Sequence, residues 1–345
     1  MAVTRDDVAK LAGVSTATVS YVINKGPRPV SEETRKKVLW AIEQLNYRPS
    51  VIARSLKTKK TYAIGIVISD ILNPTLASIE KSVEDLLLQQ NYSLTVCNSD
   101  ESPDRERMWL EMLRERRVDG IILLPTGSNR SLLFSLAEAG QRLVLIDRQI
   151  EGLEVDSVLF DNEAGAYEAV RHLIGLGHRR IGLLNLPASL TPGRGRLQGY
   201  ERAFREAGLP VLPHLIREGS FKAQEGQELA AALLDANPPP TALFVASNRL
   251  AQGALQEIKA RGLRLPDDLA LCVFDDVAYY EFITPSITAV DTDFHEFALK
   301  AVQFLIERIN GSYVGEPRTA FIPCRLRVRE STVGMTGGLA AADTF

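Results

Sequence analysis

Several polar side chains of this 345-residue chain follow apolar runs and are of the types that hold a small polar molecule. Arg196 lies in the segment GRGRLQGY, whereas Phe221 and Asp275 end or follow later apolar runs. An arginine donates paired hydrogen bonds, carboxylate and amide oxygens accept them, and an aromatic ring covers an apolar face. Together these residue types are typical of a site for a small, hydroxyl-rich molecule.

Other candidates for this site share a position in the segment that follows an apolar run. They are Asn73, Asp147, Arg148, Asp161 and Asn248. A helix cap or a turn explains any single one equally well, because Asp and Asn are common at both. Their shared position is what favours a binding site.

The elements that must position these residues are short apolar runs that alternate with helical stretches. The runs lie at residues 63–68, 93–97, 120–124, 143–146, 180–184, 242–245 and 269–274. Nearly continuous apolar strands separated by amphipathic helices indicate parallel sheets with both faces covered. These units are too many for one domain. The α/β body is therefore expected to form two doubly wound parallel-sheet subdomains, with the ligand between them at the carboxyl ends of their strands.

Three later segments imply that the chain passes between these subdomains more than twice. Residues 287–291 have the pattern of a strand and residues 294–310 that of a helix, and residues 318–328 follow as the last segment. The tail beyond Val333 is small and polar, without the heptads of a coiled coil. We therefore expect no tetramerising coil, and a homodimer is the default.

A basic head precedes this acidic body. The first sixty residues hold twelve Lys and Arg against five Asp and Glu, whereas the rest of the chain holds twenty-eight against thirty-eight. The formal net charge of −3 conceals this division. It indicates that the head binds an anionic polymer such as DNA and that the body has a different task.

The head has the pattern of three short helices that include a helix-turn-helix. Thr4 and Asp7 have the spacing of a capping box, Gly13 supplies a turn, and Ser15 can cap the second helix. A third helix begins at Ser31. The residues expected to pack inward are Val8, Leu11, Ala12, Val19, Val22, Ile23, Val38, Leu39, Ile42 and Leu45.

The outward face of the second helix separates a DNA-binding head from an ordinary helical bundle. Its residues are small or hydroxylic: Ser15, Thr16, Ala17, Thr18 and Ser20. A solvated helix more often carries Glu and Lys there. Small side chains instead let a helix enter the major groove and reach base edges or phosphates.

The stretch from Val3 to Asn24, with GVSTATVSYVIN at residues 13–24, resembles the DNA-binding head of the lactose-repressor family of bacterial transcription regulators. The resemblance implies that Thr16 and Ala17 choose operator bases and that Tyr21 stands where the family usually has Arg. A Tyr offers one hydroxyl and a ring in place of a bidentate donor, which leaves the operator sequence open but not the binding mode. The DNA-binding residues expected in the head are Thr4, Ser15, Thr16, Ala17, Thr18, Ser20, Tyr21 and Asn24.

The connector after the head has the pattern of a hinge helix. Pro49 suits a first helical position, and Ala53 and Leu56 fall on one face of a helix too short to be stable alone. In the family, this segment folds when two subunits sit on an operator, and its leucine wedges into the minor groove and bends the DNA. The DNA-binding residues expected here are Ala53, Arg54, Leu56 and Lys57. A charged, flexible linker is the alternative for the unbound protein.

The body resembles the same repressors and the periplasmic sugar-binding proteins that share their fold. The similar stretches are GHRRIGLL at 177–184, RLQGY at 196–200 and LALCVFDD at 269–276. The resemblance adds Phe294 to the candidate residues above and implies that they bind a sugar as effector. Arg249 stands where the family usually has Asp. A cation in or near the pocket would favour a ligand with a carboxylate or phosphate, such as a sugar acid, unless Arg249 points to the surface.

These observations divide the chain into five parts. They are a helix-turn-helix domain at residues 1–48, a hinge at 49–61, an N-terminal effector subdomain at 62–161 and 291–322, a C-terminal effector subdomain at 162–290 and 323–333, and a flexible tail at 334–345. The function expected of such a chain is that of an effector-responsive transcriptional regulator, most simply a repressor, of carbohydrate-related genes.

Two other classes of protein share part of this pattern. A periplasmic-type sugar carrier has such a body, but it has no basic head and begins with a signal peptide, which this N-terminus does not resemble. A nucleotide-dependent enzyme would use a glycine-rich turn, yet Gly193, Gly195 and Gly199 miss the dinucleotide fingerprint by one residue. We find no nucleophile with a base, no metal-ligand spacing, no cofactor motif and no membrane-spanning run. The expectation is a cytoplasmic protein that is not an enzyme and holds no metal or cofactor.

Overall fold

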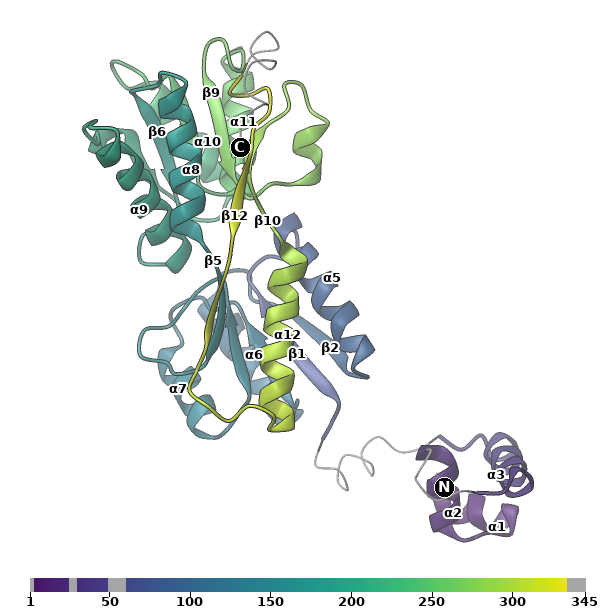
Figure 1. The fold of residues 1–345 in the computed structure, drawn as a ribbon. Helices are drawn as coiled ribbons and strands as arrows, with labels where there is room; N and C mark the ends of the chain where they lie inside the picture. The colour runs from purple at the N-terminus through teal and green to yellow at the C-terminus, as the bar shows by residue number, and fades with distance from the viewer. Residues whose placement is uncertain (1–2, 25–29, 49–59, 334–345) are drawn as a thin grey trace. The chain divides into compact units, whose positions relative to one another are not determined.

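The computed structural model describes residues 3–24, 30–48 and 60–333 of the chain (Figure 1). The chain divides into two compact units, Met1–Thr61 and Tyr62–Phe345. The first holds a small all-helical head and the second an α/β body with two sheets. The predicted fold class is therefore confirmed.

Three helices make up the head: α1 (Arg5–Ala12), α2 (Thr16–Asn24) and α3 (Glu32–Gln44). Thr4 begins α1 in a capping box, because its hydroxyl accepts from the Asp7 amide while the Asp7 carboxylate accepts from the Thr4 amide. Gly13 ends α1 with a φ of +63°, a left-handed conformation that glycine adopts at little cost. Ser31 caps α3 by accepting from the Thr34 amide.

The core of the head differs in part from the predicted one. Its buried residues are Val8, Ala9, Ala12, Val19, Val22, Val38, Ala41 and Tyr47. The prediction that Leu11 and Leu39 pack inward is wrong, since these side chains are 43% and 50% exposed. Ala9 and Ala41 are buried instead, because a single methyl group lets α1 and α3 pack closely.

The first sheet of the body is wholly parallel and has the strand order β11-β5-β4-β3-β1-β2. Its strands are β1 (Ala63–Ile68), β2 (Ser93–Asn98), β3 (Gly120–Leu123), β4 (Leu143–Ile146), β5 (Asp156–Phe160) and β11 (Thr319–Ile322). Helices α5 (Pro74–Gln89) and α12 (Phe294–Asn310) cover one face of this sheet. Helices α6 (Pro103–Glu115) and α7 (Arg130–Glu138) cover the other.

The second sheet repeats this arrangement with the order β12-β10-β9-β8-β6-β7. Its strands are β6 (Ile181–Asn185), β7 (Ile216–Glu218), β8 (Ala242–Val245), β9 (Ala270–Phe274), β10 (Thr288–Thr292) and β12 (Cys324–Arg327), of which β12 alone among the described strands runs antiparallel. Helices α8 (Asn162–Gly175) and α9 (Thr191–Glu206) cover one face, and α10 (Ala223–Leu234) and α11 (Asn248–Ala260) the other. Two 3-10 turns, η1 (Pro213–Leu215) and η2 (Ala278–Glu281), complete the body.

Three connections join the two lobes of the body (Figure 1). The chain passes from the first sheet to the second after β5, returns after β10, and passes again between β11 and β12. Residues 318–328 therefore form two strands, β11 and β12, in different sheets. Pro323 separates them, because proline has no amide with which to continue a ladder.

A buried carboxylate joins the three elements of the first lobe that lead to these connections. Asp156 begins β5 with a fully buried side chain, and it accepts hydrogen bonds of 2.8–3.0 Å from the guanidinium groups of Arg308 in α12 and Arg318 before β11. These arginines hold the pKa of Asp156 below its ordinary value against the opposing effect of burial. The pair thus ties α12 and β11 to β5.

Candidate functional site

The first turn of α2 presents a small, polar face. The Ser15 hydroxyl caps this helix, since it accepts from the Thr18 amide at 3.1 Å and lies 2.9 Å from the Thr18 hydroxyl. Thr16 and Ala17 follow it and are exposed. A capped helix start with short exposed side chains can approach the edges of bases closely.

The remaining predicted DNA-binding residues of the head lie on or beside the same helix-turn-helix. Thr4 begins α1, whereas Thr18, Ser20 and Tyr21 are half-buried in α2, and Asn24 ends that helix. The predicted hinge residues Ala53, Arg54, Leu56 and Lys57 lie outside the described residues.

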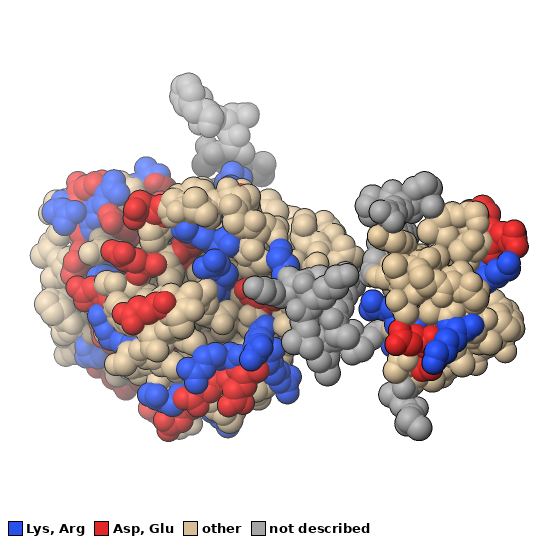
Figure 2. All heavy atoms as spheres, turned by 90° about the horizontal axis from the view of Figure 1, so that it is seen from below, with Lys and Arg blue, Asp and Glu red and all other residues tan. Residues whose placement is uncertain are grey.

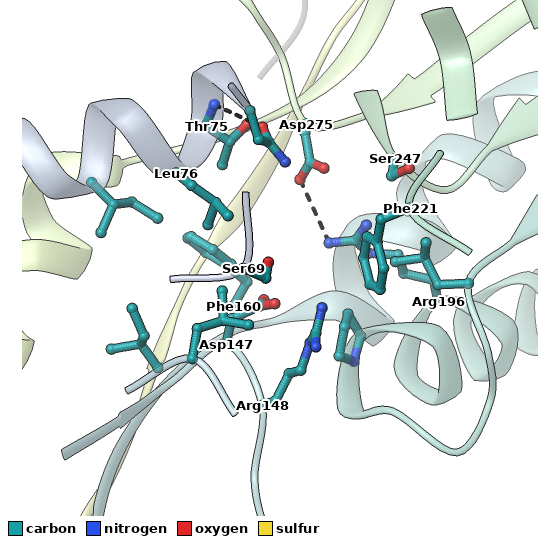
Figure 3. Close-up of a pocket in the computed structure, with 16 residues that line it drawn as sticks. Ser69, Thr75, Leu76, Asp147, Arg148, Phe160, Arg196, Phe221, Ser247 and Asp275 are labelled. Atoms are coloured by element: carbon teal, nitrogen blue, oxygen red, sulfur yellow. Dashed lines mark hydrogen bonds and ion pairs between the residues drawn. The ribbon is translucent and has the colours of Figure 1, made fainter. Parts of the chain in front are cut away.

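A pocket lies between the two lobes of the body, at the carboxyl ends of their strands (Figure 3). Its lining consists of Ser69, Asn73, Thr75, Leu76, Ile79, Leu124, Ile146, Asp147, Arg148, Phe160, Leu186, Pro192, Arg196, Phe221, Ser247 and Asp275. Six of the nine predicted effector residues are among them: Asn73, Asp147, Arg148, Arg196, Phe221 and Asp275. The polar groups thus meet where ligands bind in sheets of this type.

Two of the pocket's carboxylates occupy equivalent places in the two lobes. Asp147 directly follows β4 and Asp275 directly follows β9, each the third strand from the outer end of its sheet. Both have left-handed backbones, with φ values of +62° and +73°. Burial raises the pKa of each carboxyl above its ordinary value, although Arg196 opposes the rise at both. Asp275 is buried and Asp147 is half-buried. Desolvated carboxylates with left-handed backbones that face a cavity are typical of a ligand site.

Arg196 connects the pocket to the framework of the second lobe. Its guanidinium donates to the Asn162 side chain at 2.8 Å and to the Ala246 carbonyl, and it lies 3.5 Å from an Asp275 oxygen. The same group stacks 3.7 Å from the centre of the Phe274 ring. Arg196 lies in the second turn of α9, which begins five residues earlier at Thr191, where the adjacent proline suits the first turn.

Arg148 is also buried, and it lies across the pocket from Arg196. Its guanidinium donates to both carboxylate oxygens of Glu101, at 2.9 and 2.6 Å, and to the Pro125 carbonyl at 3.1 Å. It also covers the ring of Phe221, 4.5 Å from the ring centre. Figure 3 shows Arg148 reaching toward this ring from the side of Asp147.

Three predicted effector residues do not line the pocket. Asp161 caps α8 by accepting from the Ala164 amide, and Phe294 packs edge-on against Phe160 in the first core. Asn248 instead bridges the lobes, since its amide donates to the side chains of Asn73 and Thr75 at 2.9 Å each. A position after a strand does not distinguish a ligand contact from these three roles, which are a helix cap for Asp161, a core contact for Phe294 and a bridge between the lobes for Asn248.

Arg249 lies beside this bridge and outside the pocket lining. It is 26% exposed, and its Nε lies 3.3 Å from a carboxylate oxygen of Asp70 in the opposite lobe. Its charge is therefore paired across the cleft. The suggestion that Arg249 supplies a cation for an acidic ligand has no support in this arrangement.

Most pocket residues absent from the prediction are apolar or hydroxylic. Leu76, Ile79, Leu124 and Ile146 belong to ordinary core patterns, so their sequence carries no signal of a site. Ser69 and Ser247 carried a weak signal, because each follows a strand as the predicted residues do.

The glycines of the segment GRGRLQGY have a packing role. A Cβ on Gly199 would lie 2.3 Å from the Glu163 carbonyl, and one on Gly195 would lie 2.8 Å from the Asn162 side chain. These glycines let α9 lie closely on α8, which accounts for their spacing without a bound nucleotide. Among the described residues, no group of three or more His, Cys, Asp and Glu side chains could hold a metal ion.

The outer surface of the body carries charges of both signs. Figure 2 shows acidic and basic side chains intermingled over one of its faces. Among the residues that the structure describes, no helix is long and apolar enough to cross a membrane.

Two protein-family models match the chain. Residues 4–50 match the model described as bacterial regulatory proteins of the lacI family. Residues 170–332 match the model of the periplasmic binding protein-like domain.

Named relatives and solved structures extend this likeness over nearly the whole chain. The HTH-type transcriptional repressor PurR of Haemophilus influenzae strain PittEE is 38% identical over 306 residues, which cover 88% of this chain and 90% of that protein. The Lac repressor dimer bound to operator and the anti-inducer ONPF is 28% identical with a TM-score of 0.84, covering 96% of this chain and 99% of that one. A complex of the transcriptional regulator CelR with cellobiose is 31% identical with a TM-score of 0.73, covering 95% and 99%.

Proposed function

Because the chain belongs to the lacI family of bacterial regulatory proteins and is a DNA-binding transcriptional repressor rather than an enzyme, we propose that a small effector in the body pocket controls its affinity for an operator. One observation carries this proposal. Arg196 and Asp275 from one lobe and Asp147 from the other line a single pocket. An effector there touches both lobes and can change the angle between them.

On the DNA side, we propose that a homodimer places two heads on the half-sites of a pseudopalindromic operator in the cytoplasm. Thr16 and Ala17 would contact base edges, supported by Thr4, Ser15, Thr18, Ser20, Tyr21 and Asn24. The hinge residues Ala53, Arg54, Leu56 and Lys57 would meet the minor groove between the half-sites. We also propose that the domains of this repressor end at residues 48, 61, 161, 290, 322 and 333.

The effector is proposed to be a ring compound with a flat face and several hydrogen-bond donors. Asp147 and Asp275 accept hydrogen bonds, and the rings of Phe160 and Phe221 offer apolar faces. A sugar has this chemistry, and so does a purine base. Cellobiose in the CelR complex supports a sugar as the effector, and the name of the PurR relatives supports a purine. The genes under control would be carbohydrate-related or purine-related accordingly.

A sugar acid fits the pocket less well than a neutral ring. Arg148 pairs with Glu101, Arg196 lies 3.5 Å from Asp275, and Arg249 lies outside the lining beside Asp70. Each of these three arginines thus has a carboxylate partner. An acidic ligand would bring a further negative charge next to Asp147.

The experiment that tests the proposal is a gel-shift titration with the DNA upstream of the gene, at a fixed moderate salt concentration. The ligand arms are neutral monosaccharides and disaccharides, the matching uronic acids, and purine bases. We expect a specific shift and a change in affinity with members of one neutral class. The absence of a specific shift by the dimer would overturn the DNA-binding proposal, and a response to uronic acids alone would overturn the neutral effector.

Two substitutions separate the sites. Leu56→Ala should weaken operator binding and leave effector binding intact, because the leucine is the proposed minor-groove wedge. Arg196→Ala should have the reverse effect, because it removes a donor from the pocket. A full effector response by Arg196→Ala would contradict the assignment of the pocket.

A further inference from the structure

The two lobes of the body meet where two helices begin. Asn73 caps α5 by accepting from the Thr75 amide at 3.0 Å. Ser247 caps α11 in the same way, through the Leu250 amide at 3.2 Å. The Asn248 side chain joins these two helix starts, because it donates to Asn73 and Thr75 across the cleft. Since the start of a helix carries a partial positive charge, two starts in contact repel each other.

Arg249 adds a further positive charge to this contact. It follows Asn248 in the first turn of α11, where the charge of the helix start makes a cation unfavourable. Its Nε lies 3.3 Å from an oxygen of Asp70 in the first lobe, and the other Asp70 oxygen accepts from the Leu72 amide at 2.9 Å. When the lobes move apart, Arg249 loses the carboxylate that offsets its unfavourable position.

The ion pair of Asp70 with Arg249 is partly shielded from water. The two side chains are 21% and 26% exposed, so water and salt weaken their attraction less than that of a surface pair. The contact is nevertheless imperfect, because the Arg249 Nε and the Asn248 Oδ1 are buried and have no hydrogen-bond partner among the described residues. Buried polar groups without partners cost free energy, so this contact can hold the lobes together and still open.

The pocket beside this contact is nearly closed. Its free volume is about 40 Å³, which leaves room for no more than a few water molecules. Pockets for small ligands are typically about 300–1,000 Å³. Asn73 and Thr75, which accept from Asn248, both line the pocket. Separation of the lobes at this contact therefore widens the pocket so that a sugar or a purine can enter.

We propose that Asp70 and Arg249, together with Asn248 and its acceptors Asn73 and Thr75, form a latch that sets the balance between closed and open lobes. The latch holds the lobes closed through contacts of the chain alone, so an effector must bind strongly enough to offset their loss. Arg249 is then a positioning residue, which acts on the effector through the angle between the lobes. The link to operator control rests on the proposed function, whereas the latch itself can be tested without an effector or DNA.

The test measures how often the closed pocket opens. Leu186 lines the pocket and is 1% exposed, so Leu186→Cys places a buried thiol there that iodoacetamide reaches when the lobes part. Peptide mass spectrometry follows alkylation at position 186 separately from that of the native Cys97, Cys272 and Cys324. The Leu186→Cys protein is the parent, and every variant below carries this substitution.

Reversal of one charge of the latch should open the pocket more often. Arg249→Glu should speed alkylation at least about fivefold, because two carboxylates then face each other across the cleft. Asp70→Arg should have the same effect, because two arginines then repel each other. The double variant of Asp70→Arg with Arg249→Glu exchanges the charges and restores their attraction, so its rate should return to within about twofold of the parent.

Arg264→Glu is the matched control for these variants. It reverses the charge of an arginine in the same lobe as Arg249, but the partners of Arg264 are Asp267 and Asp268 of that lobe. The rate should therefore change less than about twofold.

Salt provides a second measurement on the parent protein. An increase from about 0.05 M to about 0.5 M salt should speed alkylation about twofold, because screening weakens the ion pair of the latch. Arg249→Gln, which has no charge to screen, should respond less.

Three results would overturn the latch. They are an Arg249→Glu rate within about twofold of the parent, a double variant as fast as the faster single variant, or an equal increase with Arg264→Glu. Thermal melting of each variant shows whether the fold is intact. If the charge-reversed variants do not fold, a parent rate that salt does not raise overturns the latch instead. A gel shift that responds to no ligand would overturn the effector proposal without changing these rates.

Discussion

At the scale of single residues, the pocket concentrates features that cost stability. Asp147 and Asp275 both have left-handed backbones, and desolvation raises the pKa of both carboxyl groups. Asp275 has Arg196 as a partner at 3.5 Å. Among the described residues, no salt bridge or side-chain hydrogen bond is found for Asp147, so a hydrogen-bond donor on an effector would offset the cost of desolvating this carboxylate.

Asp147→Asn should therefore stabilise the body and weaken effector binding. A neutral amide removes the cost of burying a charge, and asparagine tolerates a φ of +62°. The raised pKa means that the folded state holds its proton more tightly than the unfolded state, so this group contributes stability at low pH that is lost as pH rises above its ordinary value of 3.8. We expect a gain of about 1 kcal/mol at pH 7 that shrinks toward pH 4.

Melting temperatures of the protein and of Asp147→Asn between pH 4 and pH 8 check this prediction. Asp267→Asn is the control, because that carboxylate is 62% exposed on the surface of the second lobe. A destabilised Asp147→Asn at pH 7 would show that the carboxylate has a structural partner.

At the scale of elements, a buried clamp holds the crossing segments together. Asp156 of β5 binds Arg308 of α12 and Arg318 before β11. Asp156→Asn should destabilise the body by about 3 kcal/mol, because it leaves two partly buried arginines without their shared charge. Urea denaturation at pH 7 measures this loss.

The pH dependence of that loss follows from the direction of the shift. The two arginines lower the pKa of Asp156, so its contribution is present above the ordinary value of 3.8 and is lost as pH falls below it. The difference between the protein and Asp156→Asn should narrow on acidification from pH 5. Asp268→Asn, at a surface pair with Arg264, should change stability little at either pH.

Most of the elements could be predicted from the sequence, because burial on both faces of a parallel sheet leaves an apolar run that is easy to locate. The run AIGIVI coincides with β1, and the helix predicted at residues 294–310 coincides with α12. Residues 318–328 form two strands, and the apolar pattern alone does not show that Pro323 separates β11 from β12. The prediction that Leu11 is buried was wrong. Val8 can share an inward helix face with either Leu11 or Ala9, and packing of α1 against α3 buries Ala9.

The candidate site was predictable only as a set of strand ends. Asp147 and Asp275 follow strands and do line the pocket, but Asn248 follows a strand and bridges the lobes instead. Which of these happens depends on how two lobes meet, and this contact joins residues about 175 positions apart. The salt bridge between Arg148 and Glu101 could not be predicted either, because it also joins residues far apart in the sequence.

At the scale of the whole molecule, operator binding should depend on pairing two chains through an apolar surface of the body. Ile71 and Leu72 are 47% and 75% exposed beside Asp70, and Phe282 is 79% exposed in the segment after η2. The ion pair of Asp70 with Arg249 places Ile71 and Leu72 at the cleft edge, next to the second lobe. Large apolar side chains that are this exposed are typical of a surface that a second copy covers.

Phe282→Asp should therefore convert the dimer to a monomer and weaken operator binding at least about a hundredfold, because one head on one half-site loses the effective concentration that dimerisation supplies. Light scattering after size exclusion measures the mass, and gel shift measures the affinity. Val314→Asp is the matched control, because Val314 is 88% exposed in the segment between α12 and β11 and should change neither property.

A Phe282→Asp protein that remains dimeric would place the interface elsewhere. A monomer that still binds the full operator tightly would instead separate DNA affinity from pairing, and would leave effector control to act within one chain.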